Sequence, residues 1–317
     1  MKKIKILNTT ENMNIKEATE RFIKHKTIGN LSTESINYYM RSMKFFTDFY
    51  SKENQCNTIT IDIVEDYIEY LQNKEPKIKN VTINSYLRGL RAILYYFMER
   101  GYTNSFKIKL IKTTKEIKET YRDEELEILL KKPNLKNCTF AHYRAWVMTN
   151  FFLGTAVRIS TALSIKISDI DFHNNEILLR KTKNKKAQII PMSENLSRII
   201  REYLEIRNGQ QEDYLFCTQY GNQLKKKSAQ DSIKDYNIKR GIFKTSAHLY
   251  RHTFAKMWIL NGGDIFTLQK ILGHSTLDMV KEYVEMFGSD LQKKYLEHNP
   301  LDRFINEQKG NKIKVKK

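Results

Sequence analysis

The sequence predicts a mainly helical protein with a small β-sheet, divided into two domains. Its 317 residues suit roughly two domains of about 100–200 residues each. Only 4 Pro and 12 Gly interrupt the chain, and most apolar residues recur at the spacing of amphipathic helices. Residues 106–120 lose this spacing and are rich in Lys, Ile and Thr, which is typical of an interdomain linker. We therefore expect one domain over residues 10–105, a second over residues 121–300, and a basic tail over residues 301–317.

Four helices are predicted in the first domain. The first, Asn14–Lys26, is weakly amphipathic, and the next three repeat apolar residues at helical spacing. Ser32 and Thr60 occupy N-cap positions ahead of the second and third helices, and the fourth covers Thr82–Gly101, where the glycine suits the position after a helix end. Helices of this length joined by short loops predict a small all-α domain.

The second domain is predicted to combine helices with a β-hairpin. Two short segments with strand character, Glu176–Arg180 and Gln188–Pro191, flank the lysine-rich turn Lys181–Ala187, which predicts a hairpin with a polar tip. This hairpin accounts for the small sheet of the predicted fold class. The helices expected in this domain are Asp123–Lys131, Ala141–Leu153, Glu194–Arg207 and Gln230–Arg240.

The charge of the chain predicts a polyanionic partner. There are 55 Lys and Arg against 36 Asp and Glu, and the net charge of +19 is more than solubility requires. No uncharged apolar stretch has the roughly 18 residues of a membrane span, and Met1–Leu7 does not resemble a signal peptide. The 3 cysteines contain no Cys-x-x-Cys pair, which argues against a disulfide framework or a cysteine zinc site. We therefore expect a cytoplasmic protein that does not enter the membrane.

His248 and Arg251 form the first candidate site. They stand three residues apart, so in a helix they share a face and can offer several hydrogen-bond donors to one anion. An ordinary, partly buried histidine and a surface arginine are equally consistent with this segment alone. We expect His252 to lie on a different face and to take no part.

Two other segments carry candidate site residues. Ser275 and Asp278 match the S-x-x-D capping box of a helix that would carry Tyr283, and His274 stands just before that helix. Taken alone, Tyr283 would most often be a packing residue. Arg158 lies between two apolar runs, where an arginine is costly to bury unless an anion meets it.

Together and in this order, the segments resemble those of the tyrosine recombinases, the phage integrase family of site-specific DNA recombinases. The resemblance implies that a helical core-binding domain, residues 10–105, precedes a mixed α/β catalytic domain, residues 121–300. The segments similar to the family's first arginine box, its H-x-x-R box and its nucleophile box are Gly154–Ser160, His248–Ala255 and Leu272–Tyr283.

The resemblance also implies a reaction. Tyr283 would attack a DNA phosphodiester and form a 3′-phosphotyrosyl bond, with His248 accepting the phenol proton. Arg158, Arg251 and His274 would hold the phosphate, because guanidinium groups bind two of its oxygens and stay charged at any working pH. The phosphotyrosyl bond conserves the energy of the broken phosphodiester, so the reaction needs no ATP, metal or other cofactor.

Lys183 is the sixth catalytic residue that the resemblance implies. Counting back from Pro191 aligns Lys183 with the family's catalytic lysine, which would protonate the leaving 5′-oxygen. Two positions depart from the family pattern. Thr161 stands where a carboxylate often supports the first arginine, and Gln188 stands where a basic residue is common. Neighbouring lysines that could take the place of Lys183 are Lys181, Lys185 and Lys186.

Double-stranded DNA recombination sites are the partner that the resemblance implies. The expected assembly is a homotetramer on two duplexes, with a dimer at each site and a DNA-bending accessory protein as a further candidate partner. A C-terminal helix with Leu291 and Tyr295 on one face would link neighbouring protomers or, alternatively, cover its own catalytic domain. The protein would be encoded by a bacterium or phage, act at the nucleoid, and integrate, excise or resolve a mobile element.

Two other functions share these motifs. A type IB topoisomerase relaxes supercoils by the same transesterification without a partner duplex. A catalytically silent DNA-binding accessory protein would be expected to lack Tyr283 or Arg158. Both residues are present, and the further C-terminal helix favours the recombinase.

Overall fold

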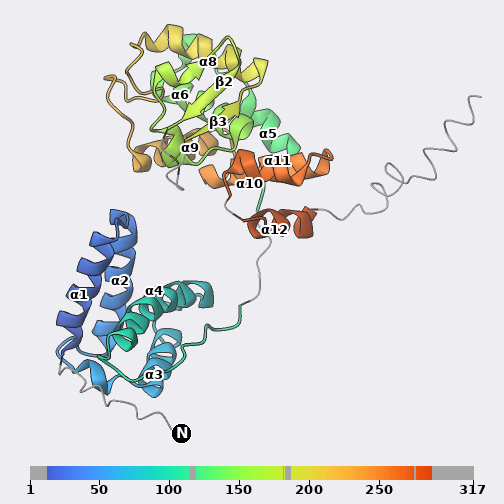
Figure 1. Ribbon diagram of the computed structural model, residues 1–317. Helices are drawn as coiled ribbons and strands as arrows, with labels where there is room; N and C mark the ends of the chain where they lie inside the picture. The colour runs from blue at the N-terminus through green and yellow to red at the C-terminus, as the bar shows by residue number, and fades with distance from the viewer. Residues whose placement is uncertain (1–12, 114–118, 181, 183–186, 275, 288–317) are drawn as a thin grey trace, which may run out of the picture. The chain divides into compact units, whose positions relative to one another are not determined.

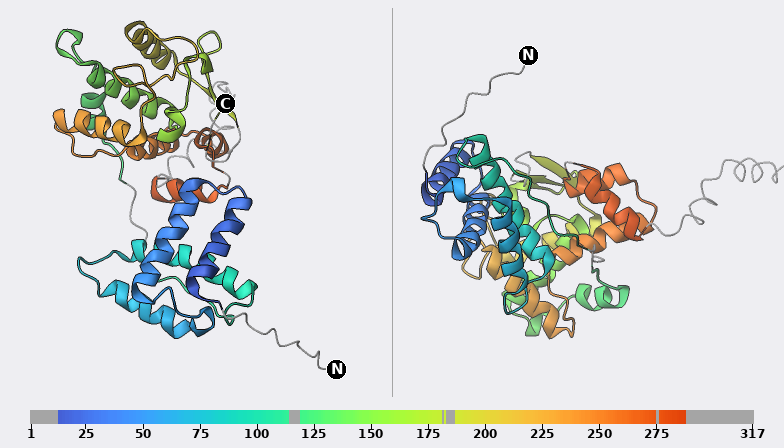
Figure 2. Two further views of the ribbon diagram at one scale, coloured as in Figure 1. Left: turned by 90° about the vertical axis from the view of Figure 1, so that its left-hand side faces the viewer. Right: turned by 90° about the horizontal axis from the view of Figure 1, so that it is seen from below.

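The computed structural model is mainly helical and has one three-stranded sheet, which confirms the predicted fold class. The chain divides into two compact units, Met1–Glu116 and Ile117–Lys317, shown in Figures 1 and 2. Within the described part of the chain, no helix combines the length and the apolar character needed to cross a membrane. The structure describes residues 13–113, 119–180, 182, 187–274 and 276–287.

The N-terminal unit contains four α-helices whose first residues are capped largely as predicted. The Ser32 side chain accepts a hydrogen bond from the Ser35 N–H, and the Thr60 side chain accepts one from the Ile63 N–H. These contacts satisfy N–H groups that have no partner within a helix. The helices are α1 (Ile15–Ile28), α2 (Thr33–Phe49), α3 (Ile61–Gln72) and α4 (Asn80–Glu99), with a 3₁₀ turn at Cys56–Thr58.

α4 is the central helix of this unit and packs most extensively on α2. A Cβ atom on Gly89 of α4 would lie 2.1 Å from the Ser42 hydroxyl of α2, so glycine permits this close approach. Phe46 of α2 and Tyr67 of α3 meet edge to face, with ring centroids 5.2 Å apart. The unit therefore has its own aromatic-rich core.

The start of the predicted linker packs on the N-terminal unit. Ile108 is buried, and Phe106, Leu110 and Ile111 contact the same core. Asn84, a buried residue of α4, fixes this segment because its amide nitrogen donates to the Ile111 carbonyl at 2.8 Å and its amide oxygen accepts from the Ile111 N–H at 2.9 Å.

We expect Asn84→Ala to lower the free energy of unfolding by about 2–4 kcal/mol, because both backbone groups of Ile111 lose their partner. Urea denaturation of the full chain, followed by circular dichroism, measures the change. Asn104→Ala, at an exposed loop position, is the control and should change stability by less than about 0.5 kcal/mol. Equal effects of the two substitutions would contradict this role of Asn84.

The C-terminal unit surrounds the buried helix α6 with other helices and a small sheet. α6 packs against α8, α9 and α10, and residues on all its sides are buried. The helices are α5 (Asp123–Leu130), α6 (Phe140–Thr155), α7 (Ile159–Ala162), α8 (Glu194–Arg207), α9 (Lys226–Lys239), α10 (Ala247–Leu260), α11 (Ile265–Leu272) and α12 (Asp278–Phe287), with 3₁₀ turns at Leu135–Asn137 and Ile167–Asp169.

The sheet is antiparallel and has the order β1 (Ile170–Asp171), β2 (Glu176–Leu179) and β3 (Gln188–Pro191). Ile177 pairs with Ile190 in the centre of the predicted hairpin, and both are buried. The hairpin prediction is confirmed. Its turn residues Lys181 and Lys183–Lys186 lie outside the described residues.

Buried polar contacts fix α10 against the rest of this unit. The Tyr250 hydroxyl donates to the Asn237 side chain of α9 at 3.1 Å, and the amide nitrogen of Asn237 donates to the Tyr121 hydroxyl at 2.9 Å. The Thr253 hydroxyl accepts a bond from the Tyr121 N–H at 2.9 Å. α11 and α12 lie beside α10 in Figures 1 and 2, and both contact it. α10 is therefore a fixed support for the residues described next.

Candidate active site

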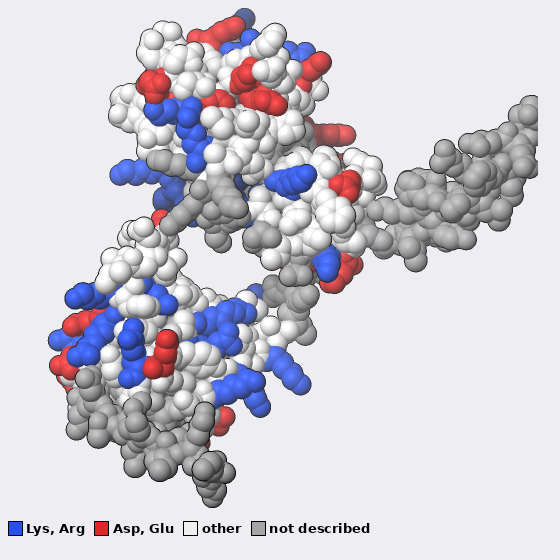
Figure 3. Space-filling model, viewed as in Figure 1, with Lys and Arg blue, Asp and Glu red and all other residues white. Residues whose placement is uncertain are grey.

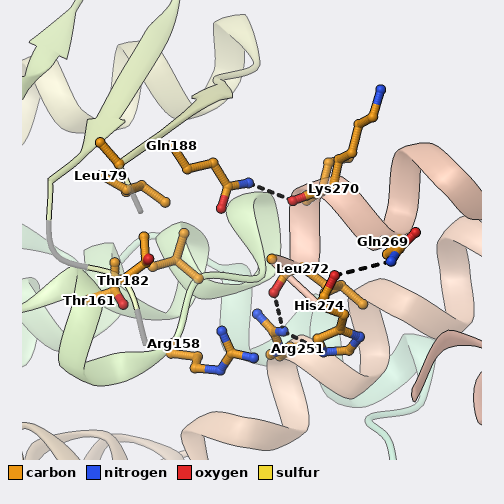
Figure 4. Close-up of a pocket in the computed structure, with 14 residues that line it drawn as sticks. Arg158, Thr161, Leu179, Thr182, Gln188, Arg251, Gln269, Lys270, Leu272 and His274 are labelled. Atoms are coloured by element: carbon orange, nitrogen blue, oxygen red, sulfur yellow. Dashed lines mark hydrogen bonds between the residues drawn. The ribbon is translucent and has the colours of Figure 1, made fainter. Parts of the chain in front are cut away.

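Three of the predicted site residues line one cavity of about 500 Å³ in the C-terminal unit. The α6–α7 turn, the β2–β3 hairpin, α10 and the end of α11 form its walls. Arg158, Arg251 and His274 come together in Figure 4, although they are far apart in the sequence. The cavity therefore presents two guanidinium groups and an imidazole from different elements.

The turn between α6 and α7 positions Arg158. Ala156, directly after α6, has left-handed backbone angles of φ 53° and ψ 17°, which cost roughly 1–2 kcal/mol in a residue with a Cβ atom. A hydrogen bond from Arg251 to the Ala156 carbonyl helps to hold this turn. Arg158 then caps α7, and its carbonyl accepts from the Ala162 N–H at 2.9 Å. The half-buried side chain of Arg158 reaches the cavity wall.

Arg251 joins three parts of the site. Its Nη1 group donates to the Ala156 carbonyl at 2.7 Å, and its Nη2 group donates to the Leu272 carbonyl at 2.5 Å. Nη2 also donates to His274 Nε2, with the two nitrogens 2.8 Å apart. Burial lowers the pKa of Arg251 to about 10, and the positive charge of Arg158 acts in the same direction. Two like charges are therefore held close together, which favours binding of an anion between them.

The contact with Arg251 determines the protonation state of His274. A guanidinium can only donate hydrogen bonds, so His274 Nε2 must accept and the imidazole is neutral. Gly273 ends α11 with a left-handed φ of 58°, and the next N–H, that of His274, donates to the Gln269 carbonyl at 3.1 Å. This helix ending directs His274 toward Arg251.

The two departures from the family pattern, Thr161 and Gln188, both line the cavity. Gln188 donates a 2.6 Å hydrogen bond from its amide to the Lys270 carbonyl and so ties β3 to the end of α11. A Cβ atom on Gly273 would lie 3.1 Å from the Gln188 amide oxygen. Gln188 therefore supports the segment that carries His274.

His248 is on the first turn of α10 and is exposed. Desolvation by its surroundings lowers the pKa of His248, and the positive charges of Arg251, Lys226 and Arg158 lower it further. The imidazole therefore lies within the electrostatic influence of both cavity arginines and is a weaker base than an isolated histidine.

Tyr283 lies on α12 and is only 2% exposed. Its ring packs in a small apolar cluster that includes Ala156, Ala255 and Leu272. Burial raises the pKa of Tyr283, and the nearby positive charges of Arg251 and Arg158 act against this shift. Tyr283 is therefore close enough to both arginines to interact with them electrostatically, although it is not one of the described residues that line the cavity.

The sequence did not predict the position of His252 beside Tyr283. His252 Nδ1 lies 2.6 Å from the Tyr283 hydroxyl, which is a hydrogen bond. Only its helix face could have been found from the sequence, because His248 and His252 are four residues apart and share that face.

Lys183 and the proposed capping residue Ser275 lie outside the described residues, as do Leu291 and Tyr295. Thr182, next to Lys183 in the chain, lines the cavity. The structure thus brings Arg158, Arg251 and His274 together, with His248 and Tyr283 within electrostatic range of the arginines.

Family comparisons match both units. The model of the phage integrase family matches residues 119–288, and that of the phage integrase SAM-like domain matches residues 9–115. The first match includes all six predicted site residues.

Similar proteins cover almost the whole chain. Tyrosine recombinase XerC of Staphylococcus aureus (strain MRSA252) is 27% identical over 292 residues, which are 89% of this chain and 96% of XerC. The Tn1549 transposon integrase in complex with transposon right end DNA has a TM-score of 0.71 at 20% identity and covers 90% of this chain and 99% of its own. XerH bound to palindromic difH substrate has a TM-score of 0.68 at 20% identity, with coverages of 88% and 83%. The two structures share the fold of this chain.

Proposed function

Because the chain belongs to the phage integrase family, we propose that it recombines DNA with Tyr283 as nucleophile and with Arg158, Arg251 and His274 holding the phosphate. The chain is a tyrosine recombinase, an enzyme that cleaves and rejoins DNA strands at specific sites. The convergence of two arginines and a neutral histidine on one cavity beside a buried tyrosine carries the assignment of these residues.

The two arginines suit the charge that develops during strand cleavage. As the Tyr283 oxygen approaches phosphorus, negative charge grows on the two non-bridging oxygens of the phosphate. Arg251 uses three of its five N–H groups in the contacts with Ala156, Leu272 and His274, so its plane is fixed before DNA binds. A cation held in this way needs little reorganisation in the transition state.

Two proton transfers complete the proposed reaction. The Tyr283 hydroxyl must lose its proton as it attacks, and the leaving 5′-oxygen must gain one. We assign the second role to Lys183, on the hairpin that contributes Thr182 and Gln188 to the cavity. The product is a 3′-phosphotyrosyl DNA with a free 5′-hydroxyl, and attack by another 5′-hydroxyl reverses the step and joins new strands.

Single-turnover cleavage of a nicked suicide substrate tests this function. We expect the full chain, mixed with DNA that carries its recombination site, to form an adduct that resists sodium dodecyl sulfate, in buffer containing EDTA. Supercoil relaxation without a second site would instead indicate the topoisomerase reaction. A cleavage step that requires Mg²⁺ would contradict the mechanism, because its electrophilic groups are guanidinium and imidazole.

DNA is the partner of this enzyme, and both units offer positive charge to it. Lys and Arg side chains gather on the face of the N-terminal unit in Figure 3, and the whole chain has a net charge of +19. Contacts of this kind neutralise phosphates without reading sequence, so affinity should fall steeply with salt. We assign core binding to residues 10–105 and catalysis to residues 121–300.

The proposed assembly is a homotetramer on two duplexes, in which a C-terminal helix of one protomer binds the next. We expect a chain ending after Phe287, the last residue of α12, to bind a half-site normally but to lose cooperative filling of the full site and strand exchange. A full-length Leu291→Ala/Tyr295→Ala variant should behave in the same way.

Gel-shift titration on one and two half-sites measures this cooperativity. Unchanged cooperativity combined with a lower melting temperature would show that the C-terminal segment covers its own catalytic domain instead. A DNA-bending accessory protein, if one is needed, should raise the yield of strand exchange without changing half-site affinity.

A further inference from the structure

The hydrogen bond between His252 and Tyr283 has no counterpart among the roles assigned above. His252 lies on the second turn of α10, one residue after Arg251, and its Nδ1 atom is 2.6 Å from the Tyr283 hydroxyl of α12. The two rings are inclined at 46° with centroids 5.7 Å apart, so the contact is made through the polar edge of the imidazole and not by ring stacking. A short contact of this kind joins a titratable nitrogen directly to the atom that attacks phosphorus.

We infer that His252 is a catalytic residue that accepts the proton of Tyr283 during strand cleavage, a role that rests on Tyr283 being the nucleophile. The Tyr283 O–H bond breaks and its proton moves to His252 Nδ1, while the phenol oxygen forms a bond to phosphorus. The bond from phosphorus to the 5′-oxygen breaks, and that oxygen takes a proton from Lys183. In the reverse step His252 returns its proton to the tyrosine.

The described contacts favour His252 over His248 as the acceptor. Desolvation by its surroundings, and then the charges of Arg251, Lys226 and Arg158, lower the pKa of His248 and make it a weaker base. His252 already lies at hydrogen-bonding distance from the phenol before DNA is bound. A general base must lie about 2.6–3.2 Å, measured between heavy atoms, from the atom whose proton it removes.

Several charged groups act on this pair from the elements around it. Arg251 of α10 and Arg158 of the α6–α7 turn stabilise the phenolate, whereas Glu282 of α12 opposes it. His274, after α11, is neutral and bonded to Arg251. The last turn of α6, residues 152–155, contains no ionisable side chain. Lys270 of α11 lines the cavity, but its exposed side chain points away from Arg158 and Arg251 in Figure 4.

His252→Asn separates proton transfer from positioning. The asparagine amide can occupy nearly the place of Nδ1 and accept a hydrogen bond, but it cannot take up the proton. At pH 7 we expect single-turnover cleavage of the suicide substrate to slow by about 10²-fold or more, with unchanged half-site affinity. The variant's rate should then rise about tenfold per pH unit toward the phenol pKa, because Tyr283 ionises without help. The wild-type rate should level off at a lower pH.

A substrate with a 5′-bridging sulfur distinguishes the base from the acid. Sulfur leaves without needing a proton. This substrate should therefore restore the cleavage rate of the Lys183→Ala variant but not that of the His252→Asn variant. His173→Asn, at an exposed histidine of the same unit, is the matched control and should cleave at the wild-type rate. His252→Gln, which also has no titratable group, is measured alongside, and the variant that binds the half-site with wild-type affinity is used.

The outcomes separate this inference from the proposed function. Cleavage within threefold of the wild type by His252→Asn, with an unchanged pH profile, would overturn the inference while leaving Tyr283 as the nucleophile. The inference would also be overturned if His248→Asn, and not His252→Asn, showed the slow cleavage whose rate rises with pH. Failure of the wild-type chain itself to form an adduct would instead overturn the proposed function.

Discussion

Tyr283→Phe is expected to abolish the covalent DNA adduct while leaving DNA binding intact. The substitution removes only the oxygen that we propose as the nucleophile, and the ring can still pack in its cluster with Ala255 and Leu272. The loss should therefore reach the detection limit of the assay, because no other group replaces a missing nucleophile. Gel shift measures binding, and denaturing electrophoresis of the suicide-substrate reaction measures the adduct.

Tyr236→Phe is the control for this experiment. Its hydroxyl donates to the Leu129 carbonyl at 2.7 Å in the core of the same unit. This variant should lose stability but retain the adduct, which distinguishes the loss of a nucleophile from the loss of a phenol hydroxyl in general. An adduct that persists in Tyr283→Phe would mean that another tyrosine attacks the DNA.

Arg251→Lys should slow cleavage by roughly 10³-fold, which is the upper range for the loss of one fixed donor to a transition-state oxygen. Lysine cannot reproduce the planar group that binds Ala156, Leu272 and His274 at once. Burial and the charge of Arg158, which lower the pKa of Arg251, would also act on a lysine ammonium, whose pKa is lower from the start. In part of the Arg251→Lys molecules, the lysine at this position would therefore be a neutral amine at alkaline pH.

Single-turnover rates across pH 6–9 measure the effect, with Arg198→Lys as an exposed control on α8. The deficit of Arg251→Lys should grow as the pH rises, since the neutral amine binds no anion. A rate within tenfold of the wild type at all pH values would show that Arg251 only supports the structure.

Most of the long helices were predictable from their apolar period, but no bounds were predicted for α10, although it has 14 residues. Ser32 and Thr60 cap helices of 17 and 12 residues as predicted, and the prediction for Glu194–Arg207 agrees with α8 at both ends. The prediction for α9 began at Gln230, four residues late, because its first turn is lysine-rich and carries no apolar period.

Shorter elements could not be predicted in this way. α7 has 4 residues and β1 has 2, which is too few to establish a repeat. They form because tertiary contacts hold them. The Arg251 guanidinium binds carbonyl groups at the end of α6 and at the end of α11, and such a contact across 95 residues leaves no local pattern.

The sequence predicted which residues form the candidate site better than it predicted the contacts between them. The three boxes resembled those of a known family, so Arg158, Arg251 and His274 could be selected together before their convergence was visible. The role of Gln188 could not be predicted, since it depends on the distant Lys270 carbonyl. The contact of His252 with Tyr283 could not be predicted either, since it joins α10 to α12 across 31 residues.

The burial of Tyr283 bears on how the protein contacts DNA that lacks its recombination site. A protein with a net charge of +19 will spend most of its time on DNA that does not contain its site. Were the phenol oxygen open to solvent beside two arginines, each of those encounters would risk a strand break. With only 2% of the residue exposed, α12 would have to shift before the proposed nucleophile could reach a phosphate. Burial of Tyr283 would then protect DNA outside the recombination site from cleavage during the search.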